Sequence, residues 1–219
     1  MKCEAIIFDL DGTLLNTLDD LADANNQALT EMGFPTHPVE SYKYHIGNGV
    51  RLLLERTLPE DSRDDAMVEK GVAMMKAAYD KCWANKTRPY EGIAEMLDEL
   101  TRRGVRMAIL SNKPHEYTQV IVDKLLANWN FEEVWGVSDT TPPKPDPAGI
   151  SSLVEKMGVA KENLLYLGDT ATDMETATGA DIFAVGVLWG FREADELTQS
   201  GANVLLSKPA ELLDVMDKD

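Results

Sequence analysis

Regular alternation of strand-like and helix-like segments constrains the fold of this chain more than any other feature. From Pro89 onward, short apolar runs typical of buried strands alternate with segments whose apolar residues recur at helical spacing. The predicted strands cover residues 105–110, 131–137, 164–167, 182–187 and 204–206, and the predicted helices cover residues 93–100, 116–127, 148–157, 174–178 and 210–216. This alternation is typical of α/β proteins whose parallel sheet is covered by helices on both faces. An apolar run at residues 5–8 adds one strand before the alternation begins.

The segment between that first strand and Pro89 has a different character. Its apolar residues follow helical spacing and predict helices near residues 18–32, 40–45, 50–58 and 62–84. Thr17 stands where an N-cap is expected and Gly33 where the first of these helices should end. No convincing strand occurs between residues 17 and 88. We therefore predict an all-helical insert in an α/β chain.

The charge balance limits the partners of this chain. Its 219 residues include 38 acidic and 21 basic side chains, a formal net charge of -17. Such a field repels nucleic acid and anionic membrane surfaces, and we expect neither as a partner. It repels phosphorylated substrates as well, so that a phosphate site here needs local positive charge or a metal ion.

Cysteine usage and hydropathy point to the cytoplasm. The two cysteines, Cys3 and Cys82, form no CxxC pair, which argues against a zinc site and suits reduced thiols. The N-terminus leads directly into the first strand without the apolar region of a signal peptide. No apolar run approaches the roughly 20 residues that span a bilayer. A cytoplasmic protein is therefore expected.

Two carboxylates follow the first strand directly. Asp9 and Asp11 are two residues apart, and Gly12 and Thr13 come next. Side chains at positions i and i+2 of an extended chain point the same way, so that the two carboxylates face one spot. Like charges that close repel unless a cation or a proton lies between them. Asp-Gly is also a common turn dipeptide, and these residues alone leave a turn and an active site equally open.

Polar residues at the ends of the other predicted strands favour the active site. Ser111-Asn112-Lys113 follows the second strand, and Lys144 lies between two prolines in the loop after the third. Gly168-Asp169-Thr170 follows the fourth strand, with Asp173 one helical turn later. Ligands bind at the carboxyl ends of the strands in such sheets. Carboxylates, a hydroxyl, an amide and a lysine are therefore expected at one edge of the sheet.

This set of side chains suits phosphoryl transfer. A carboxylate can attack phosphorus and form an aspartyl-phosphate. Mg²⁺ can neutralise the two anions, and Asp9 and Asp169 offer the hard oxygen ligands that it prefers. Lys144 can balance the charge of the transferring group, and the Ser111 hydroxyl with nearby backbone N–H groups can hold phosphate oxygens. Asp11 can protonate the leaving oxygen and later take a proton from water.

The order and spacing of these motifs resemble those of the haloacid dehalogenase-like hydrolase superfamily, in its phosphoglycolate phosphatase-like branch. The matching motifs are Asp9-Leu10-Asp11-Gly12-Thr13, Ser111-Asn112-Lys113, Lys144-Pro145 and Gly168-Asp169-Thr170 through Asp173, and the stretch Val187-Leu188-Trp189-Gly190-Phe191 also fits this branch. The resemblance covers essentially the whole chain. It implies a Rossmann-like doubly wound parallel sheet core, residues 1–16 and 89–219, with an inserted helical cap domain, residues 17–88.

The resemblance also implies roles for individual residues. Asp9 would be the nucleophile and Asp11 the general acid and base. Mg²⁺ would be held by Asp9, the backbone carbonyl of Asp11 and Asp169, and Asp173 would support the metal through water or an outer contact. The phosphoryl group would be bound by Gly12, Thr13, Ser111, Asn112 and Lys144. Lys113, beside the second motif, is expected to be solvated rather than catalytic.

Specificity is expected to reside in the helical cap. The loop that contains Asn48 and Arg51 can close over the site, where the arginine could contact a substrate carboxylate. The alternative is a helix connector with a solvated arginine.

Three functions remain open from the sequence. The first is a Mg²⁺-dependent phosphatase that hydrolyses a small phosphorylated metabolite, such as phosphoglycolate, through an aspartyl-phosphate. The second is a sugar phosphomutase of the β-phosphoglucomutase type, and the third is a phosphate-binding module without turnover. The intact Asp11 argues against the third, since a pure binder has no use for a general acid. The expected partner is a small phosphorylated metabolite, and the chain is expected to be a monomer or a weak homodimer.

Overall fold

The computed structural model describes residues 3–217 and divides the chain into two compact units. Met1–Leu15 and Pro89–Asp219 form the first, here called the core unit, and Asn16–Arg88 forms the second, the helical unit. Two short strands, β2 (Leu15–Asn16) and β3 (Arg88–Pro89), pair where the chain passes from one unit to the other.

A parallel six-stranded sheet forms the centre of the core unit. Its strands are β1 (Ala5–Phe8), β4 (Arg106–Pro114), β5 (Glu133–Val137), β6 (Leu164–Gly168), β7 (Phe183–Val187) and β8 (Val204–Leu206), in the spatial order β5-β4-β1-β6-β7-β8. All four residues of β1 are buried, since β4 and β6 flank it on either side. The chain builds outward from β1 to β5 and then crosses to β6 on the other side of β1. The carboxyl ends of β1, β4 and β6 thus meet where the strand order reverses, the usual place for a ligand in such sheets.

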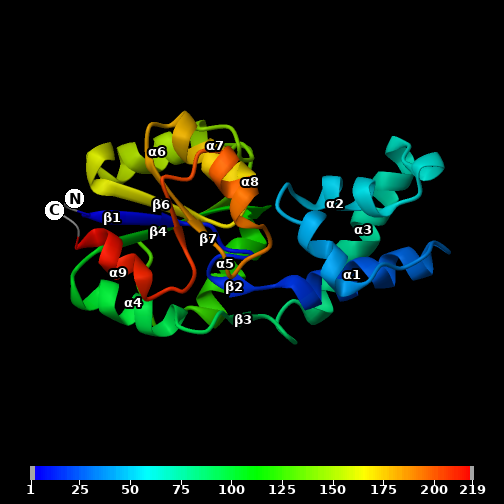
Figure 1. The fold of residues 1–219 in the computed structure, drawn as a ribbon. Helices are drawn as coiled ribbons and strands as arrows, with labels where there is room; N and C mark the ends of the chain where they lie inside the picture. Colours follow the sequence, from blue (N-terminus) through cyan, green and yellow to red (C-terminus); the bar gives the residue numbers. More distant parts are fainter. Residues whose placement is uncertain (1–2, 218–219) are drawn as a thin grey trace. The chain divides into compact units, whose positions relative to one another are not determined.

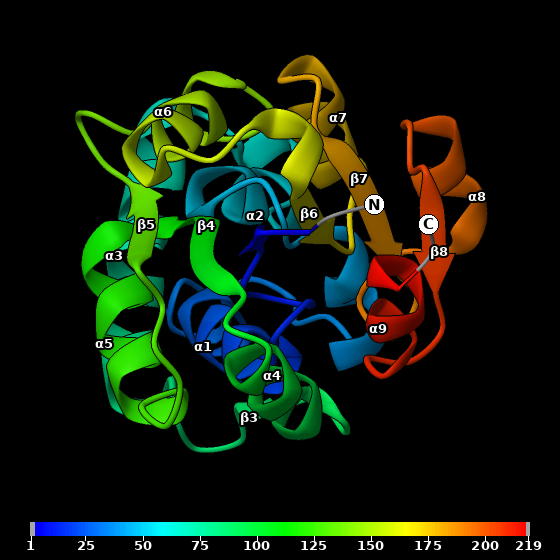
Figure 2. The same cartoon turned by 90° about the vertical axis from the view of Figure 1, so that its left-hand side faces the viewer.

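Helices cover both faces of this sheet, as the sequence predicted. Figure 2 shows α6 and α7 on one face and α4 and α9 on the other. The helices of the core unit are α4 (Ile93–Arg102), α5 (His115–Leu125), α6 (Ala148–Met157), α7 (Ala171–Gly179), α8 (Ala194–Gln199) and α9 (Glu211–Met216). Between the sheet and the helices α6, α7 and α8 lies a buried apolar cluster that includes Ile7, Leu110, Ile150, Met174 and Leu197. The strands are apolar on both faces because both faces are covered.

The helical unit contains α1 (Leu18–Glu31), α2 (Val50–Thr57) and α3 (Asp65–Cys82), with the 3-10 segments η1 (Val39–Tyr44) and η2 (Glu60–Ser62) between them (Figure 1). Helix α1 packs against α3 and η1, and α2 packs against α3. Asn25 on α1 donates to the Tyr42 hydroxyl on η1 at 2.9 Å and to the Thr57 hydroxyl on α2 at 3.0 Å. No residue between 17 and 87 of the described chain lies in a strand.

Several boundaries differ from the predicted ones for local reasons. Strand β4 does not end at Ser111: its pairing with β5 shifts register after Leu110 and resumes at Pro114, so that the second motif lies inside the strand. Helix α7 begins at Ala171 because Thr170 and Asp173 form a capping box. Helix α3 begins at Asp65 rather than Ser62 because the Asp64 carboxylate caps the Met67 N–H. The short helix α8 was not predicted.

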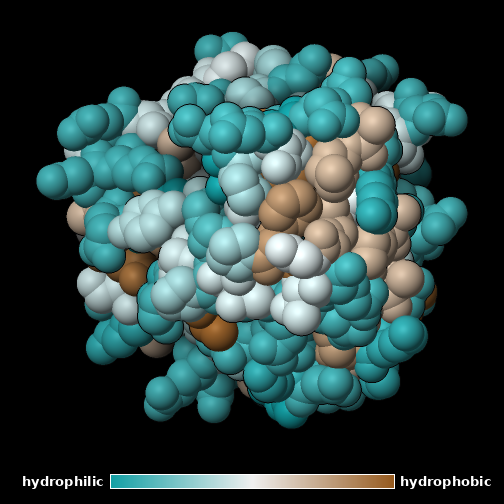
Figure 3. All heavy atoms as spheres, turned by 90° about the vertical axis from the view of Figure 1, so that its right-hand side faces the viewer, coloured by the Kyte–Doolittle hydropathy of each residue, from teal (hydrophilic) through white to brown (hydrophobic). Residues whose placement is uncertain are grey.

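Within the described residues, no helix combines the length and the apolar character that crossing a membrane requires. Hydrophilic side chains cover most of the face drawn in Figure 3, in keeping with the large share of charged residues. Large exposed apolar side chains among the described residues are Tyr44, Leu52 and Val120.

Candidate active site

A tight turn follows β1 and sets the position of Asp9 and Asp11. The Asp9 N–H still bonds to the Leu167 carbonyl of β6 at 2.9 Å, so the nucleophile expected from the sequence is anchored to the sheet. Gly12 then adopts a φ of +89°, and a side chain there would place its Cβ 2.2 Å from an Asp169 carboxylate oxygen. Only glycine therefore allows the turn to approach the end of β6 this closely.

Three carboxylates and one lysine meet beside this turn. Ligand oxygens of Asp9, Asp169 and Asp173 all lie within 4.8 Å of one another, and all three residues are buried. The Lys144 ammonium lies 2.8 Å from Asp9 Oδ1 and 2.6 Å from Asp173 Oδ1. The sequence placed these residues at the ends of different strands or in the following loop and helix, and the structure brings all four together.

Burial dominates the electrostatics of this cluster. Burial raises the pKa of Asp9 to about 7, against the lowering effect of Lys144, and the charge of Asp173 raises it further. Burial also holds the pKa of Asp169 well above its usual value, and the charges of Asp173 and Asp9 act in the same direction. For Lys144, burial alone lowers the pKa, but the charges of Asp173 and Asp9 outweigh it and keep the pKa well above its usual range. The lysine is therefore a permanent cation among carboxylates that are costly to ionise.

Asp173 is held by four donors. Its Oδ1 accepts from Lys144 Nζ at 2.6 Å and from the Tyr166 hydroxyl at 3.0 Å. Its Oδ2 accepts from the Thr170 N–H at 3.1 Å and from the Thr170 hydroxyl at 2.7 Å. A carboxylate with this many donors fixes the position of Lys144, a role the sequence did not indicate.

Asn112 also holds Lys144, but through the backbone. Its Oδ1 accepts from the Lys144 N–H at 2.7 Å, and its Nδ2 donates to the Lys144 carbonyl at 3.1 Å. The Asn112 side chain, which was predicted to bind phosphate, thus holds the backbone of the loop that contains Lys144. The neighbouring Ser111 hydroxyl is buried and accepts from the Lys113 N–H at 3.2 Å.

The two acids of the first motif have different partners. Asp11 lies outside the three-carboxylate group and pairs with Lys113, whose Nζ is 2.8 Å from Oδ2 and 3.0 Å from Oδ1. The prediction that Lys113 is solvated is therefore wrong: the residue is only 8% exposed. Because β4 continues to Pro114, it carries this side chain into the site instead of releasing it to solvent at Ser111.

Thr13 and the segment after β7 close the other side of the cluster. The buried Thr13 hydroxyl donates to Asp169 Oδ1 at 3.2 Å, and the Phe191 N–H donates to Asp169 Oδ2 at 2.8 Å. The Trp189 indole donates to the Thr13 carbonyl at 2.9 Å. The Thr13 side chain, predicted to bind phosphate, thus orients Asp169, while its turn remains beside the carboxylates.

The donor set of this cluster fits a hard divalent cation. Asp9 and Asp169 present carboxylate oxygens, which Mg²⁺ prefers. Ionising both in a buried place is unfavourable, and a cation between them would relieve that cost. Asp173 is geometrically part of the group, but its oxygens already accept four hydrogen bonds. It suits an outer, supporting position.

The two candidate contacts of the helical unit are engaged within that unit. Arg51 forms ion pairs with Glu55, Asp65 and Glu69. Asn48 accepts a hydrogen bond from Arg56 at 2.8 Å, which ties the loop to α2. Their part in substrate binding stays a prediction.

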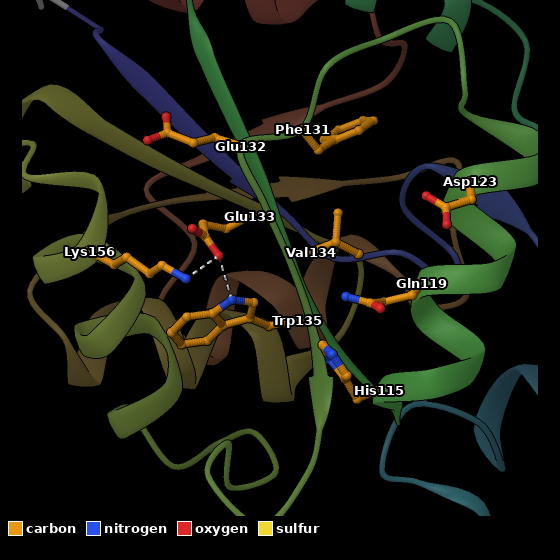
Figure 4. A pocket seen from close by; sticks show the side chains of 9 residues that line it. All are labelled: His115, Gln119, Asp123, Phe131, Glu132, Glu133, Val134, Trp135 and Lys156. Atoms are coloured by element: carbon orange, nitrogen blue, oxygen red, sulfur yellow. Dashed lines mark hydrogen bonds and ion pairs between the residues drawn. The ribbon is translucent and has the colours of Figure 1, made fainter.

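A separate hollow of about 440 Å³ lies against the edge strand β5 and shares no residue with the motifs (Figure 4). Three of its polar groups pair with each other, since Glu133 accepts from both Lys156 and the Trp135 indole. The electrostatics of the site therefore centre on the carboxylate cluster and not on this hollow.

Sequence reasoning missed Tyr166 and the role of Lys113. Tyr166 reads as one more apolar residue in the buried strand β6, but its hydroxyl lies 3.0 Å from Lys144 Nζ. A buried tyrosine needs a hydrogen-bond partner, and this requirement was the available signal.

These features are those of a known family. The family model described as haloacid dehalogenase-like hydrolase matches residues 6–187, and the chain belongs to this family. The match includes the motifs around Asp9, Ser111, Lys144 and Asp169 and the whole of the helical unit, and it ends at Val187.

Individual relatives resemble nearly the whole chain. Phosphoglycolate phosphatase of Pseudomonas putida is 30% identical over 95% of this chain and 78% of its own length. The enzyme of the same name from Pseudomonas syringae pv. tomato is 32% identical over 92% of this chain and 75% of its own length. A solved structure from Lactobacillus delbrueckii subsp. bulgaricus, provisionally assigned as a phosphoglycolate phosphatase, has a TM-score of 0.91 and 30% identity, covering 99% of each chain. Relatives of this similarity support a phosphatase.

Proposed function

We propose that the chain is a Mg²⁺-dependent phosphatase that hydrolyses a small phosphorylated metabolite through an aspartyl-phosphate on Asp9. The observation that carries the proposal is the buried cluster of Asp9, Lys144 and Asp169 at the strand ends where the sheet order reverses. The names of the relatives make phosphoglycolate the first substrate to test.

In the first half of the reaction, an Asp9 carboxylate oxygen attacks phosphorus. The bond between phosphorus and the leaving oxygen breaks, and its electron pair stays on that oxygen. Asp11 donates a proton to the oxygen, so that an alcohol leaves. Lys144, 2.8 Å from Asp9, offers a fixed positive charge to the oxygens of the transferring group.

In the second half, water attacks the phosphorus of the aspartyl-phosphate. Asp11, now a carboxylate, takes the proton from this water, and Asp9 leaves as a carboxylate. One acid therefore works in both directions while the other remains the site of covalent attachment. Their different partners, Lys144 for Asp9 and Lys113 for Asp11, support this division of roles.

Mg²⁺ would be held by Asp9 and Asp169, with the backbone carbonyl of Asp11 as the family resemblance implies. When bound, it supplies positive charge that lets two anions approach. Asp173 would support the site from outside, because its oxygens already hold Lys144, Tyr166 and Thr170. The Ser111 hydroxyl and the Thr13 N–H would bind phosphate oxygens. The Gly12 N–H donates to the Leu15 carbonyl at 2.9 Å, so that Gly12 would contribute through the turn it allows and not through this donor.

The partner is proposed to be a small metabolite and not a polymer. The net charge of -17 disfavours nucleic acid and anionic membranes, while Lys144 and Lys113 supply the local positive charges that a phosphate group needs. A monomer or weak homodimer is sufficient for this chemistry, since every residue in it comes from one chain.

The test is a panel of phosphomonoesters, including phosphoglycolate, glucose 1-phosphate and p-nitrophenyl phosphate, assayed with Mg²⁺ or with EDTA. We expect phosphate release that needs Mg²⁺ and that falls by at least about 10³-fold in Asp9→Asn, because the nucleophile is lost. Asp181→Asn is the matched control, since Asp181 is exposed and pairs only weakly with Lys161 at 3.7 Å. Release unaffected by EDTA or by Asp9→Asn contradicts the mechanism, and isomerisation of glucose 1-phosphate without release indicates a mutase.

A further inference from the structure

The ion pair between Lys113 and Asp11 joins two motifs that lie 102 residues apart in the chain. The Lys113 ammonium contacts both carboxylate oxygens, at 2.8 Å and 3.0 Å. The side chains are 5% and 13% exposed, so that little water competes for this contact. A cation that reaches both oxygens restricts both the position and the plane of the carboxyl group.

Lys113 itself is held firmly. Its N–H donates to the Ser111 hydroxyl at 3.2 Å, and its carbonyl accepts from the Thr118 hydroxyl at 3.3 Å. The neighbouring strand β5 lies so close that a Cβ on Gly136 would be 2.4 Å from the Lys113 carbonyl oxygen. The lysine therefore projects from a closely packed and hydrogen-bonded stretch of backbone toward a residue on a turn.

Each acid of the first motif pairs with a different lysine of the site. Lys144 contacts Asp9 and Asp173, whereas Lys113 contacts Asp11. Asp11 follows Asp9 by two residues, and without a partner of its own its carboxyl would be drawn toward Lys144 as well. Lys113 supplies a second cation, so that Asp11 has a partner separate from that of Asp9.

We propose that Lys113 is a positioning residue that holds the Asp11 carboxyl where it exchanges protons with the reacting oxygens. The inference rests on the proposed function, because it acts through the acid and base of that reaction. Lys113 transfers no proton itself. It determines where the proton carrier lies when the bond between phosphorus and the leaving oxygen breaks.

This role makes the effect of Lys113 depend on the leaving group. An alkoxide leaves poorly unless Asp11 protonates it, whereas p-nitrophenolate is a stable anion that leaves without a proton. The ratio kcat/KM reports the steps up to the first irreversible one, so it isolates the first half of the reaction. A misplaced Asp11 must therefore slow an alkyl phosphate more than p-nitrophenyl phosphate.

The experiment compares Lys113→Met and Lys113→Arg with wild type on phosphoglycolate and on p-nitrophenyl phosphate. We expect Lys113→Met to lower kcat/KM for phosphoglycolate by about 30-fold and for p-nitrophenyl phosphate by less than about 3-fold, since general acid catalysis contributes 10²–10⁴-fold when intact. The loss on phosphoglycolate should appear mainly in kcat, and Lys113→Arg should recover part of it. Lys156→Met removes a surface lysine paired with Glu133 in the same unit and should change neither ratio.

A double-variant cycle tests whether Lys113 acts through Asp11. In an Asp11→Asn background, Lys113→Met should lower kcat/KM by no more than about 2-fold, because the group it positions is already absent. Equal losses on both esters, a change confined to KM, or full additivity with Asp11→Asn each overturn the role of Lys113 while leaving a phosphatase. A wild-type protein without Mg²⁺-dependent phosphatase activity overturns the proposed function and this inference together.

Discussion

The two units of the molecule each hold a cluster of opposite charges, and the clusters differ in burial rather than in geometry. In the core unit, Lys144 lies 2.6 Å from Asp173, and the two side chains are 3% and 1% exposed. In the helical unit, Arg51 lies 2.5 Å from Asp65, and the two side chains are 44% and 93% exposed. The distances are nearly equal, but only one of these pairs is shielded from water.

This difference in burial indicates which charged residues serve a site and which only make the surface soluble. Taking an ion out of water costs several kcal/mol even after relaxation, so that a buried cluster persists only with good partners and a use for them. An exposed pair costs little to form and contributes little. Burial and competing partners, and not the presence of ion pairs as such, therefore distinguish the core cluster, which we propose to be the reactive one, from the exposed cluster.

Among the charged and polar partners that surround the acids, the largest expected effect comes from removing Lys144, the cation of the core cluster. Lys144→Met should lower kcat/KM by at least about 100-fold, because a fixed charge at the transferring group is lost. It should also lower the free energy of unfolding by about 3 kcal/mol, because Asp173 and Asp9 lose their buried partner. Steady-state kinetics and urea unfolding measure the two effects. Lys161→Met, which removes an exposed lysine, is the control and should alter neither; a stable and active Lys144→Met variant contradicts the comparison.

The second prediction concerns pH and metal. The pKa of Asp9 is raised from 3.8 to about 7, so that the folded protein without metal binds more protons than the unfolded chain between these values. Protonation of Asp9 in the folded protein contributes stability. This contribution is fully present below pH 3.8, the pKa of Asp9 in the unfolded chain, and it is lost as the pH rises to about 7, its pKa in the folded protein. We expect the free energy of unfolding without metal to fall by about 2 to 3 kcal/mol from this group between pH 5 and pH 8.

Two comparisons isolate that effect in thermal or urea unfolding. Asp9→Asn cannot titrate and should have a shallower pH dependence than wild type. Mg²⁺ requires ionised ligands and should therefore stabilise the wild type more at pH 8 than at pH 5.5. Equal pH slopes for wild type and Asp9→Asn would show that burial does not control the ionisation of Asp9.

The third prediction addresses Tyr166, whose hydroxyl contacts both Lys144 and Asp173 at 3.0 Å. Tyr166→Phe removes one hydroxyl and should cost about 1 to 2 kcal/mol of stability. It should also lower kcat by roughly 3- to 10-fold through a displaced Lys144, since small misplacements at an active site reduce rate. Tyr42→Phe removes a hydroxyl from a buried tyrosine of the helical unit, where it donates to Asn26 at 2.7 Å. Similar activity losses in both variants would assign Tyr166 to stability alone.

The smallest expected effect belongs to the exposed cluster. Arg51→Met removes the partner of three exposed or half-exposed carboxylates and should shift the melting temperature by no more than about 2 °C. If Arg51 contacts substrate, KM for phosphoglycolate should rise while KM for p-nitrophenyl phosphate stays constant, since only the former carries a carboxylate. An unchanged KM for both substrates would show that Arg51 forms surface ion pairs and does not contact the substrate.

Much of the fold followed from local sequence patterns. The apolar runs at β1, β6 and β8 and the spacing of α6, with its stop at Gly158, have the bounds that the sequence predicted to within one residue. Two of the errors occur where other interactions override the local pattern, at the capping box of Thr170 and Asp173 and at the register shift in the pairing of β4 with β5. Hydrophobic periodicity carries no information on either.

The sequence also predicted part of the site. Ligands bind at the carboxyl ends of the strands of such a sheet, so that Asp9 and Asp169 at strand ends and Lys144 in a following loop were expected together, whereas Tyr166 and Lys113 were not. The position of a residue along the chain indicates which strand or helix carries it and at which end. The fold then brings those ends together.

Only the tertiary structure decided which partner each of these residues has. Asn112 holds the backbone of Lys144, Tyr166 contacts its ammonium, and Lys113 pairs with Asp11 instead of entering solvent. Each contact joins segments more than 20 residues apart, and its formation depends on strand register and on which side chains are buried. A sequence pattern specifies the kind of group at each strand end, whereas the pairing of charges depends on which of them the packed sheet shields from water.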